Sequence, residues 1–216
     1  LLNDLDITNE LLNGALSGSS SLNLIQQFTG ESADSYLSWN VASAGDFNND
    51  GLDDMIFGAP ADSTIGTESG KVYVVFGKAS GALSTLTEVT NGVGGFALYG
   101  ESAGDMAGHS VGGGGDVNGD GIDDIVIGAP YASDITGNFV HSGRAYVIFG
   151  TQTPASSLLL SDIADDANSA GFMMYSASIY DYAGGSVSLG DVNGDGKADV
   201  IVGEPLEHKH FLASLY

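Results

Sequence analysis

An acidic loop that runs directly into an apolar segment occurs three times in this sequence, and this repeat constrains the fold more than any other feature. The loop is clearest at 116–124, where carboxylates alternate with small residues before the run Ile125-Val-Ile begins. The other copies span 46–54 and 191–199, so the second starts 70 residues after the first and the third 75 residues later. Because the spacing within the loop is the same each time, we interpret it as a repeated structural unit.

The residue types of each loop suit a calcium ion. Positions 1, 3, 5 and 9 carry Asp or Asn, position 7 can offer its backbone carbonyl, and position 6 is a glycine that permits a sharp bend. These donors are hard oxygens in a short segment, which suits Ca²⁺ better than the stricter octahedron of Mg²⁺. Without a cation the carboxylates would repel one another. The ligands of the three predicted calcium sites are Asp46, Asn48, Asp50, Leu52 and Asp54; Asp116, Asn118, Asp120, Ile122 and Asp124; and Asp191, Asn193, Asp195, Lys197 and Asp199.

Two alternatives to this calcium loop have to be weighed. One is the EF-hand, which needs a bidentate Glu at position 12 and a helix on each side. Position 12 is Phe57, Ile127 or Val202 here, and each lies in an apolar run typical of a strand. The other alternative is an acidic surface turn that binds no metal. We favour a metal site at a turn between two strands.

The same order of strand-like segments recurs around each loop. A segment of small residues leads into the loop, an apolar segment leaves it, and segments rich in β-branched and aromatic residues follow. Four strands per repeat, the first nearly free of large side chains, predict the blade of a β-propeller, because small residues fit where blades crowd the central axis. We therefore predict an all-β fold of antiparallel four-stranded blades, with repeat units at 38–101, 109–177 and 186–205.

These motifs resemble FG-GAP repeats, which occur in the β-propellers of integrin α-chains and in many bacterial surface proteins. The signature is carried by Phe57-Gly-Ala-Pro60, Ile127-Gly-Ala-Pro130 and Val202-Gly-Glu-Pro205, and the resemblance covers 24–205. It implies calcium between the first two strands of each blade, at the three loops already named. It also implies a non-enzymatic extracellular module for cell adhesion or protein interaction, with an unknown protein or glycan as its ligand.

The chain departs from the integrin pattern in its number of blades. Integrin propellers close with about seven blades, whereas this sequence holds two complete units, part of a third and a predicted leading strand at 24–31. About three blades cannot close a ring, so we expect a partial propeller that closes by homo-oligomerisation or within a longer parent chain. We interpret 1–23 as a linker or the tail of a preceding unit. The tail 206–216 is atypical; its Leu-Glu-His start resembles vector sequence, although Phe211–Tyr216 could add a strand.

Composition narrows the classes of partner and the cellular location. The chain has 28 acidic and 5 basic side chains, a net charge of −23, which argues against nucleic acid and anionic membrane surfaces as partners. It has no cysteine, hence no disulfide or thiolate metal site, and no apolar stretch long enough to span a membrane. Calcium loops of extracellular modules need the millimolar calcium found outside cells. We therefore expect a secreted or cell-surface protein.

An enzyme is the competing functional class, because FG-GAP repeats also accompany phospholipase-type catalytic domains. Gly108-His-Ser-Val-Gly112 matches the Gly-x-Ser-x-Gly pattern, but a nucleophile elbow needs a strand before it and a helix after it, whereas Ser110 begins a predicted strand. The four histidines lack the spacing of a zinc site. We predict no catalytic residue and no enzyme activity; the alternative is the propeller portion of a secreted hydrolase. Trp39, which matches His109, is interpreted as a packing residue.

Overall fold

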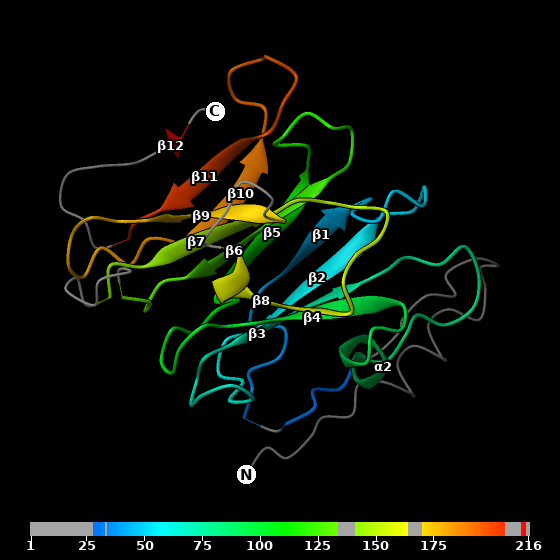
Figure 1. The fold of residues 1–216 in the computed structure, drawn as a ribbon, viewed down its shortest axis with the longest axis horizontal. Coiled ribbons are helices and arrows are strands. Elements are labelled where there is room, and N and C mark those ends of the chain that lie inside the picture. Colours follow the sequence, from blue (N-terminus) through cyan, green and yellow to red (C-terminus); the bar gives the residue numbers. More distant parts are fainter. Residues whose placement is uncertain (1–27, 33, 134–140, 164–169, 206–212, 215–216) are drawn as a thin grey trace, which may run out of the picture.

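The computed structural model describes residues 28–32, 34–133, 141–163, 170–205 and 213–214. These residues form three neighbouring β-sheets, which Figure 1 shows side by side from blue through green to orange. The first sheet contains β1 (Val41–Gly45), β2 (Asp54–Ala59), β3 (Lys71–Val75), β4 (Gly95–Tyr99) and β8 (Ser157–Leu159). The second contains β5 (Ser110–Gly115), β6 (Asp124–Ala129), β7 (Arg144–Ile148) and β9 (Gly171–Tyr175). The third contains β10 (Ser186–Gly190), β11 (Asp199–Gly203) and β12 (Ala213–Ser214).

The strands follow the order that the repeats predict. Within each blade, strands that follow one another in the repeat pair antiparallel, from the inner pairs β1–β2, β5–β6 and β10–β11 outward. The inner strands β1, β5 and β10 lie next to one another, with β5 in the middle. The prediction of an all-β partial propeller of about three blades is therefore confirmed.

The predicted leading strand at 24–31 is wrong for the part that the structure describes, because 28–31 are not in a strand. Side-chain contacts hold this segment instead: the Phe28 ring lies 4.9 Å from that of Phe57, and Glu31 pairs with Lys71. Residues 1–27 lie outside the described residues. In the C-terminal tail, 206–212 and 215–216 also lie outside them, while β12 pairs with β11 as an added strand.

The connection between the third and fourth strands differs between the first two blades. In blade 1 it forms the short helix α2 (Leu86–Thr90), which Thr85 and Glu88 cap reciprocally. In blade 2 it forms β8 and the 3₁₀ turn η1 (Leu160–Asp162). Strand β8 pairs parallel with β4 and so covers the outer edge of blade 1. Neither α2 nor β8 was expected from the sequence.

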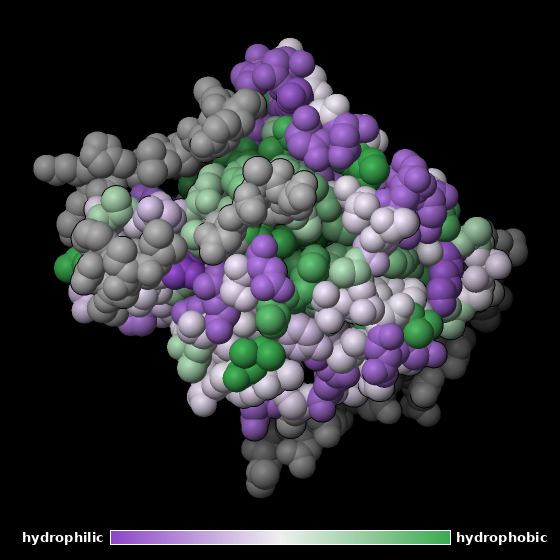
Figure 2. Space-filling view, viewed as in Figure 1, coloured by the Kyte–Doolittle hydropathy of each residue, from purple (hydrophilic) through white to green (hydrophobic). Residues whose placement is uncertain are grey.

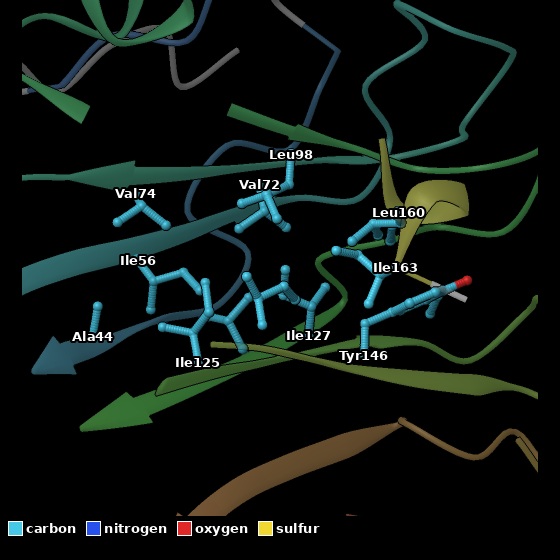
Figure 3. Close-up of a cluster of buried hydrophobic side chains, with 14 of the residues drawn as sticks. Ala44, Ile56, Val72, Val74, Leu98, Ile125, Ile127, Tyr146, Leu160 and Ile163 are labelled. Carbon is cyan, nitrogen blue, oxygen red and sulfur yellow. The ribbon is translucent and has the colours of Figure 1, made fainter. Parts of the chain in front are cut away.

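The largest apolar core lies between blades 1 and 2, where the facing sheets interdigitate (Figure 3). Ile56, Val72 and Leu98 of blade 1 meet Ile125 and Ile127 of blade 2, and all five side chains are fully buried. A second core joins blades 2 and 3, and a third lies between the outer face of blade 1 and α2. In the view of Figure 2, hydrophilic residues lie mostly along the edge of the molecule and hydrophobic residues nearer its middle. Burial between sheets therefore stabilises the stack of blades.

The glycine of each Gly-Ala-Pro motif marks a close approach between blades. A Cβ atom on Gly58 would lie 1.9 Å from the carbonyl oxygen of Gly108, and one on Gly128 would lie 2.0 Å from that of Gly184. Both neighbours are backbone atoms at the entrance to the next blade. A side chain at either glycine would therefore push two blades apart.

Candidate metal centres

The three predicted calcium loops connect the first strand of each blade to the second. Position 1 of every loop directly follows β1, β5 or β10, and position 9 is the first residue of β2, β6 or β11. All three loops therefore lie at the same end of their blades. A cation bound in such a loop would join the inner strand to its neighbour.

The side chains at positions 1, 3 and 5 lie together in each loop. In the first loop the Asp50 N–H donates to Asp46 Oδ1 and to Asn48 Oδ1, each at 2.9 Å, so these two oxygens converge. The matching distances are 3.1 and 2.8 Å in the second loop and 3.2 and 2.8 Å in the third. The position-3 amide also donates to the position-5 carboxylate in all three, at 2.9, 2.9 and 3.0 Å. One arrangement of oxygen donors thus occurs three times.

The bend at position 6 is the one that its glycine predicts. Gly51, Gly121 and Gly196 have φ angles of 89°, 86° and 88°, in the region that favours glycine. Their N–H groups donate to the second carboxylate oxygen of position 1, at 2.9, 2.7 and 3.0 Å. Position 7 joins the network through its own N–H, which donates to the position-5 carboxylate.

The position-9 aspartates are buried at the start of the second strands. Asp54, Asp124 and Asp199 are each at most 2% exposed. Burial raises the pKa of Asp54 to about 6, and the charges of Asp50 and Asp46 add to that rise, while the Gly77 N–H opposes it. Burial likewise raises the pKa of Asp124 to about 6. A buried carboxylate beside other carboxylates is an environment that a nearby cation stabilises.

The aspartates at positions 1, 5 and 9 of a loop do not converge on one point. Among the described residues, no group of three His, Asp or Glu side chains is close enough to hold a metal ion. Asp124 instead accepts hydrogen bonds from the N–H groups of Val117 and Gly150, at 2.7 and 2.8 Å. In the first loop Asp54 Oδ2 is buried and has no hydrogen-bond partner in the described part of the chain. In the third loop, Asp199 Oδ1 accepts the position-3 amide of Asn193 at 3.2 Å. The donors are oxygens of the kind that Ca²⁺ prefers, and a complete site requires the aspartates of positions 1, 5 and 9 to come closer together.

Two partly buried ion pairs were not identified from the sequence, where the Gly-Glu-Ser-Ala repeat and the Lys/Arg-x-Tyr repeat were the available signals. The Lys71 Nζ lies 2.5 Å from Glu31, and the Arg144 guanidinium lies 2.5 Å from Glu101. Tyrosine hydroxyls two residues after Lys71 and Arg144 donate to the same glutamates. Each pair fastens the turn before an inner strand to the third strand of the same blade. These glutamates have a structural role and no catalytic partner in the contacts described.

A row of Tyr, Trp and His rings lies at the end of the blades opposite the predicted calcium loops. Its members come shortly before the inner or third strand of a blade or shortly after the second strand, and those strand ends lie away from the loops. We define this aromatic row as Tyr36, Trp39, His109, Tyr131, His141, Tyr180 and Tyr182. Adjacent ring centroids are 5.3 to 6.4 Å apart. Tyr36 and Trp39 are 59% and 58% exposed, so the interpretation of Trp39 as a packing residue is wrong. Large exposed rings from three blades form a surface suited to contact with another molecule.

The Gly-x-Ser-x-Gly motif at Gly108–Gly112, which we did not interpret as a nucleophile elbow, places its serine at the interface between blades 2 and 3. Ser110 is the first residue of β5, and its Oγ donates to the carbonyl oxygen of Gly184 at 2.8 Å. The hydroxyl is therefore engaged by the neighbouring blade. His109 and His141 belong to the aromatic row, while His208 and His210 lie outside the described residues.

Comparison with known proteins identifies similar repeats. A family model described as the FG-GAP repeat matches residues 38–75, 107–148 and 183–211. Integrin alpha-4 of Xenopus laevis is 31% identical over 84% of this chain, and integrin alpha-PS2 of Drosophila melanogaster is 31% identical over 83%. Integrin alpha-8 of Gallus gallus is 37% identical over 54% of the chain. The chain spans only 16%, 11% and 11% of the lengths of these relatives, respectively. In the described residues no helix is long and apolar enough to cross a membrane.

Proposed function

The chain belongs to the FG-GAP repeat family, and from that premise we propose that it is a calcium-stabilised extracellular β-propeller module for adhesion or protein–protein interaction. The observation that carries this proposal is the single arrangement of oxygen donors that recurs in three loops at one end of the blades. The similarity to integrin alpha chains supports the adhesive role.

In this proposal calcium has a structural role. The side chains of positions 1, 3, 5 and 9 and the backbone carbonyl of position 7 would hold one ion in each loop, which uses the fifteen predicted ligands. The ion would neutralise the carboxylates of each loop, and it would tie the inner strand to the second strand of each blade. The repeat units 38–101, 109–177 and 186–205 then correspond to one calcium loop each.

The aromatic row is the surface that we propose for the partner, an unidentified protein or glycan. It lies at the end away from the calcium loops, so a partner there would not compete with the ions. Loops held by a rigid scaffold are common binding surfaces. The calcium loops would contribute by keeping the three blades in register.

Calcium stoichiometry tests the first half of this proposal. Isothermal titration of the chelator-treated chain should give three calcium ions per chain, with dissociation constants of about 10⁻⁴ to 10⁻³ M. Asp50→Ala, Asp120→Ala and Asp195→Ala should each remove one ion. Asp53→Ala is the matched control, because Asp53 is an exposed loop residue outside the predicted ligand set. No binding at millimolar calcium, or the same stoichiometry in all four variants, would contradict the proposal.

Adhesion tests the second half. Beads that carry the chain would be applied to immobilised extracellular-matrix proteins and glycans, in millimolar calcium and in excess EGTA. We expect retention on at least one surface in calcium, with loss of retention in EGTA and in the double variant Trp39→Ala, Tyr131→Ala. Retention that is unchanged by EGTA and by the double variant would refute this role for the aromatic row.

A further inference from the structure

The first two calcium loops touch through a residue outside the predicted ligand set. The N–H of Asp46, which is position 1 of the first loop, donates to Asp123 Oδ2 at 2.8 Å. Asp123 is position 8 of the second loop and directly precedes the predicted ligand Asp124. The two residues are 77 positions apart in the sequence and lie in different blades.

The backbone before the first loop is shaped to receive this carboxylate. A Cβ atom on Gly45 would lie 2.2 Å from Asp123 Oδ2, and Gly45 has a φ of +67° at a bulge in β1. Only glycine allows the carboxylate to come this close. The absence of a side chain at Gly45 therefore lets Asp123 reach the Asp46 N–H at hydrogen-bond distance.

At the junction of the second and third loops, a different residue occupies the position that corresponds to Asp123. There position 8 is Ala198, whose N–H donates to the Asp116 carbonyl oxygen at 2.8 Å, and its Cβ faces Gly115. In the first loop, position 8 is the exposed Asp53. A carboxylate that reaches the neighbouring loop is therefore provided at the junction of the first and second loops, by Asp123.

Both ends of this contact lead directly to predicted calcium ligands. The Asp46 carboxylate accepts the N–H groups of Asp50 and Gly51, so an ion that orders the first loop also fixes the Asp46 backbone. On the other side, Asp124 Oδ1 accepts the Gly150 N–H at 2.8 Å, and the next N–H, of Thr151, donates to the carbonyl oxygen of the first-loop residue after Asp46 at 2.9 Å. The two loops therefore share one connected network of hydrogen bonds.

We propose that Asp123 is a positioning residue that couples calcium binding at the first loop to calcium binding at the second, so that each ion strengthens binding of the other. This inference rests on the proposed calcium binding. Calcium at the first loop holds the Asp46 N–H where Asp123 can accept it, and this restrains Asp124 for the second ion. Because coupling between binding sites is reciprocal, the second ion has the same effect on the first.

A site-resolved calcium titration tests this coupling in the full chain. The amide signals of Gly51, Gly121 and Gly196 in NMR spectra report on the first, second and third loops, since each N–H binds the position-1 carboxylate of its own loop. We expect Asp50→Ala, which disables the first loop, to weaken calcium binding at the second loop about five- to tenfold. In the Asp123→Ala background the same change should weaken it less than about twofold.

Three comparisons separate the coupling from other effects. Asp123→Asn keeps an oxygen acceptor and should retain most of the coupling, which a role of charge alone would not predict. Asp53→Ala removes a carboxylate from the matching position and should leave the coupling unchanged. The Asp46 amide signal should move in Asp123→Ala even without calcium, which keeps the proposal testable if Asp50→Ala folds poorly.

The outcomes distinguish this inference from the function on which it rests. If no loop signal responds to millimolar calcium, the proposed calcium binding fails. If the loops bind calcium but Asp50→Ala weakens the second loop equally with and without Asp123, the coupling role of Asp123 is overturned and calcium binding stands.

Discussion

Replacement of Gly58 by alanine should destabilise the chain strongly, although alanine is the better residue for most strand interiors. In an ordinary strand, glycine to alanine stabilises by about 0.5–1 kcal/mol, because alanine loses less backbone entropy on folding. At Gly58 the new Cβ atom would lie 1.9 Å from the Gly108 carbonyl oxygen. Ordinary van der Waals contact for a Cβ atom begins near 3.4 Å. The close approach of blade 2 therefore makes the substitution destabilising rather than stabilising.

The magnitude follows from the separation that this contact forces. The two backbones must move apart by about 1.5 Å, and a gap of 0.5–1 Å already removes a quarter to a half of the dispersion energy between facing atoms. Gly58 lies between Phe57 and the buried Ala59, beside the apolar core that joins blades 1 and 2. With overpacking costs of 1–3 kcal/mol or more, we expect a net loss of about 3 kcal/mol.

Urea unfolding followed by circular dichroism measures this loss as a change in midpoint at constant slope. Gly203→Ala is the matched control, because Gly203 is the same motif position in blade 3 and its Cβ would meet the rotatable Ser186 Oγ at 2.2 Å. We expect Gly203→Ala to stay within about 1 kcal/mol of the parent chain. A loss below 1 kcal/mol for Gly58→Ala, or equal losses for both variants, would refute the argument that this glycine sets the spacing between blades.

Three further predictions concern charged side chains. Arg144→Met should cost about 3 kcal/mol in thermal unfolding, because it leaves Glu101 without its cation; an equal loss in the double variant with Glu101→Gln would contradict this. Burial raises the pKa of Asp105 to about 6 from 3.8, so its contribution is fully stabilising below pH 4 and is lost as the pH rises through 6. Asp105→Asn should therefore stabilise the chain at neutral pH by about 3 kcal/mol and not at pH 4, and equal effects at both pH values would refute this. Lys197 Nζ lies 3.4 Å from the Asn118 carbonyl oxygen, so its positive charge opposes a cation in the second loop. Lys197→Gln should therefore raise the calcium affinity of that loop roughly two- to fivefold in low salt and less in high salt, as measured by calorimetry.

The blades could be predicted because their signals are local. Two adjacent strands are specified by the small residues of 110–115 before an acidic loop and by the apolar run Ile125-Val-Ile after it. This signal does not depend on the neighbouring blades. The same holds for positions 1, 3 and 5 of each loop, which hydrogen-bond to residues within five positions. The spacing of residues within each repeat was therefore enough to predict the fold and to predict that these loop side chains lie together.

The features that the sequence did not reveal depend on contacts between distant segments. Ser157–Leu159 has little strand signal of its own and becomes β8 by pairing with β4 of another blade. Trp39 and His109 are 70 positions apart, so their shared surface follows from the stacking of blades. The contact between Asp123 and the Asp46 N–H has the same origin. The segment 28–31 is likewise held by distant residues, since Phe28 contacts Phe57 and Glu31 pairs with Lys71.

The most direct test of the central claim is the melting temperature of the chain in millimolar calcium and in excess EGTA. At 10 to 100 times the dissociation constant, each independent site adds about 1.4 to 2.7 kcal/mol to the free energy of unfolding, so three sites should raise the melting temperature by many degrees. Asp50→Ala, Asp120→Ala and Asp195→Ala should each reduce that rise. The same melting temperature in calcium and in EGTA would contradict calcium as part of this fold.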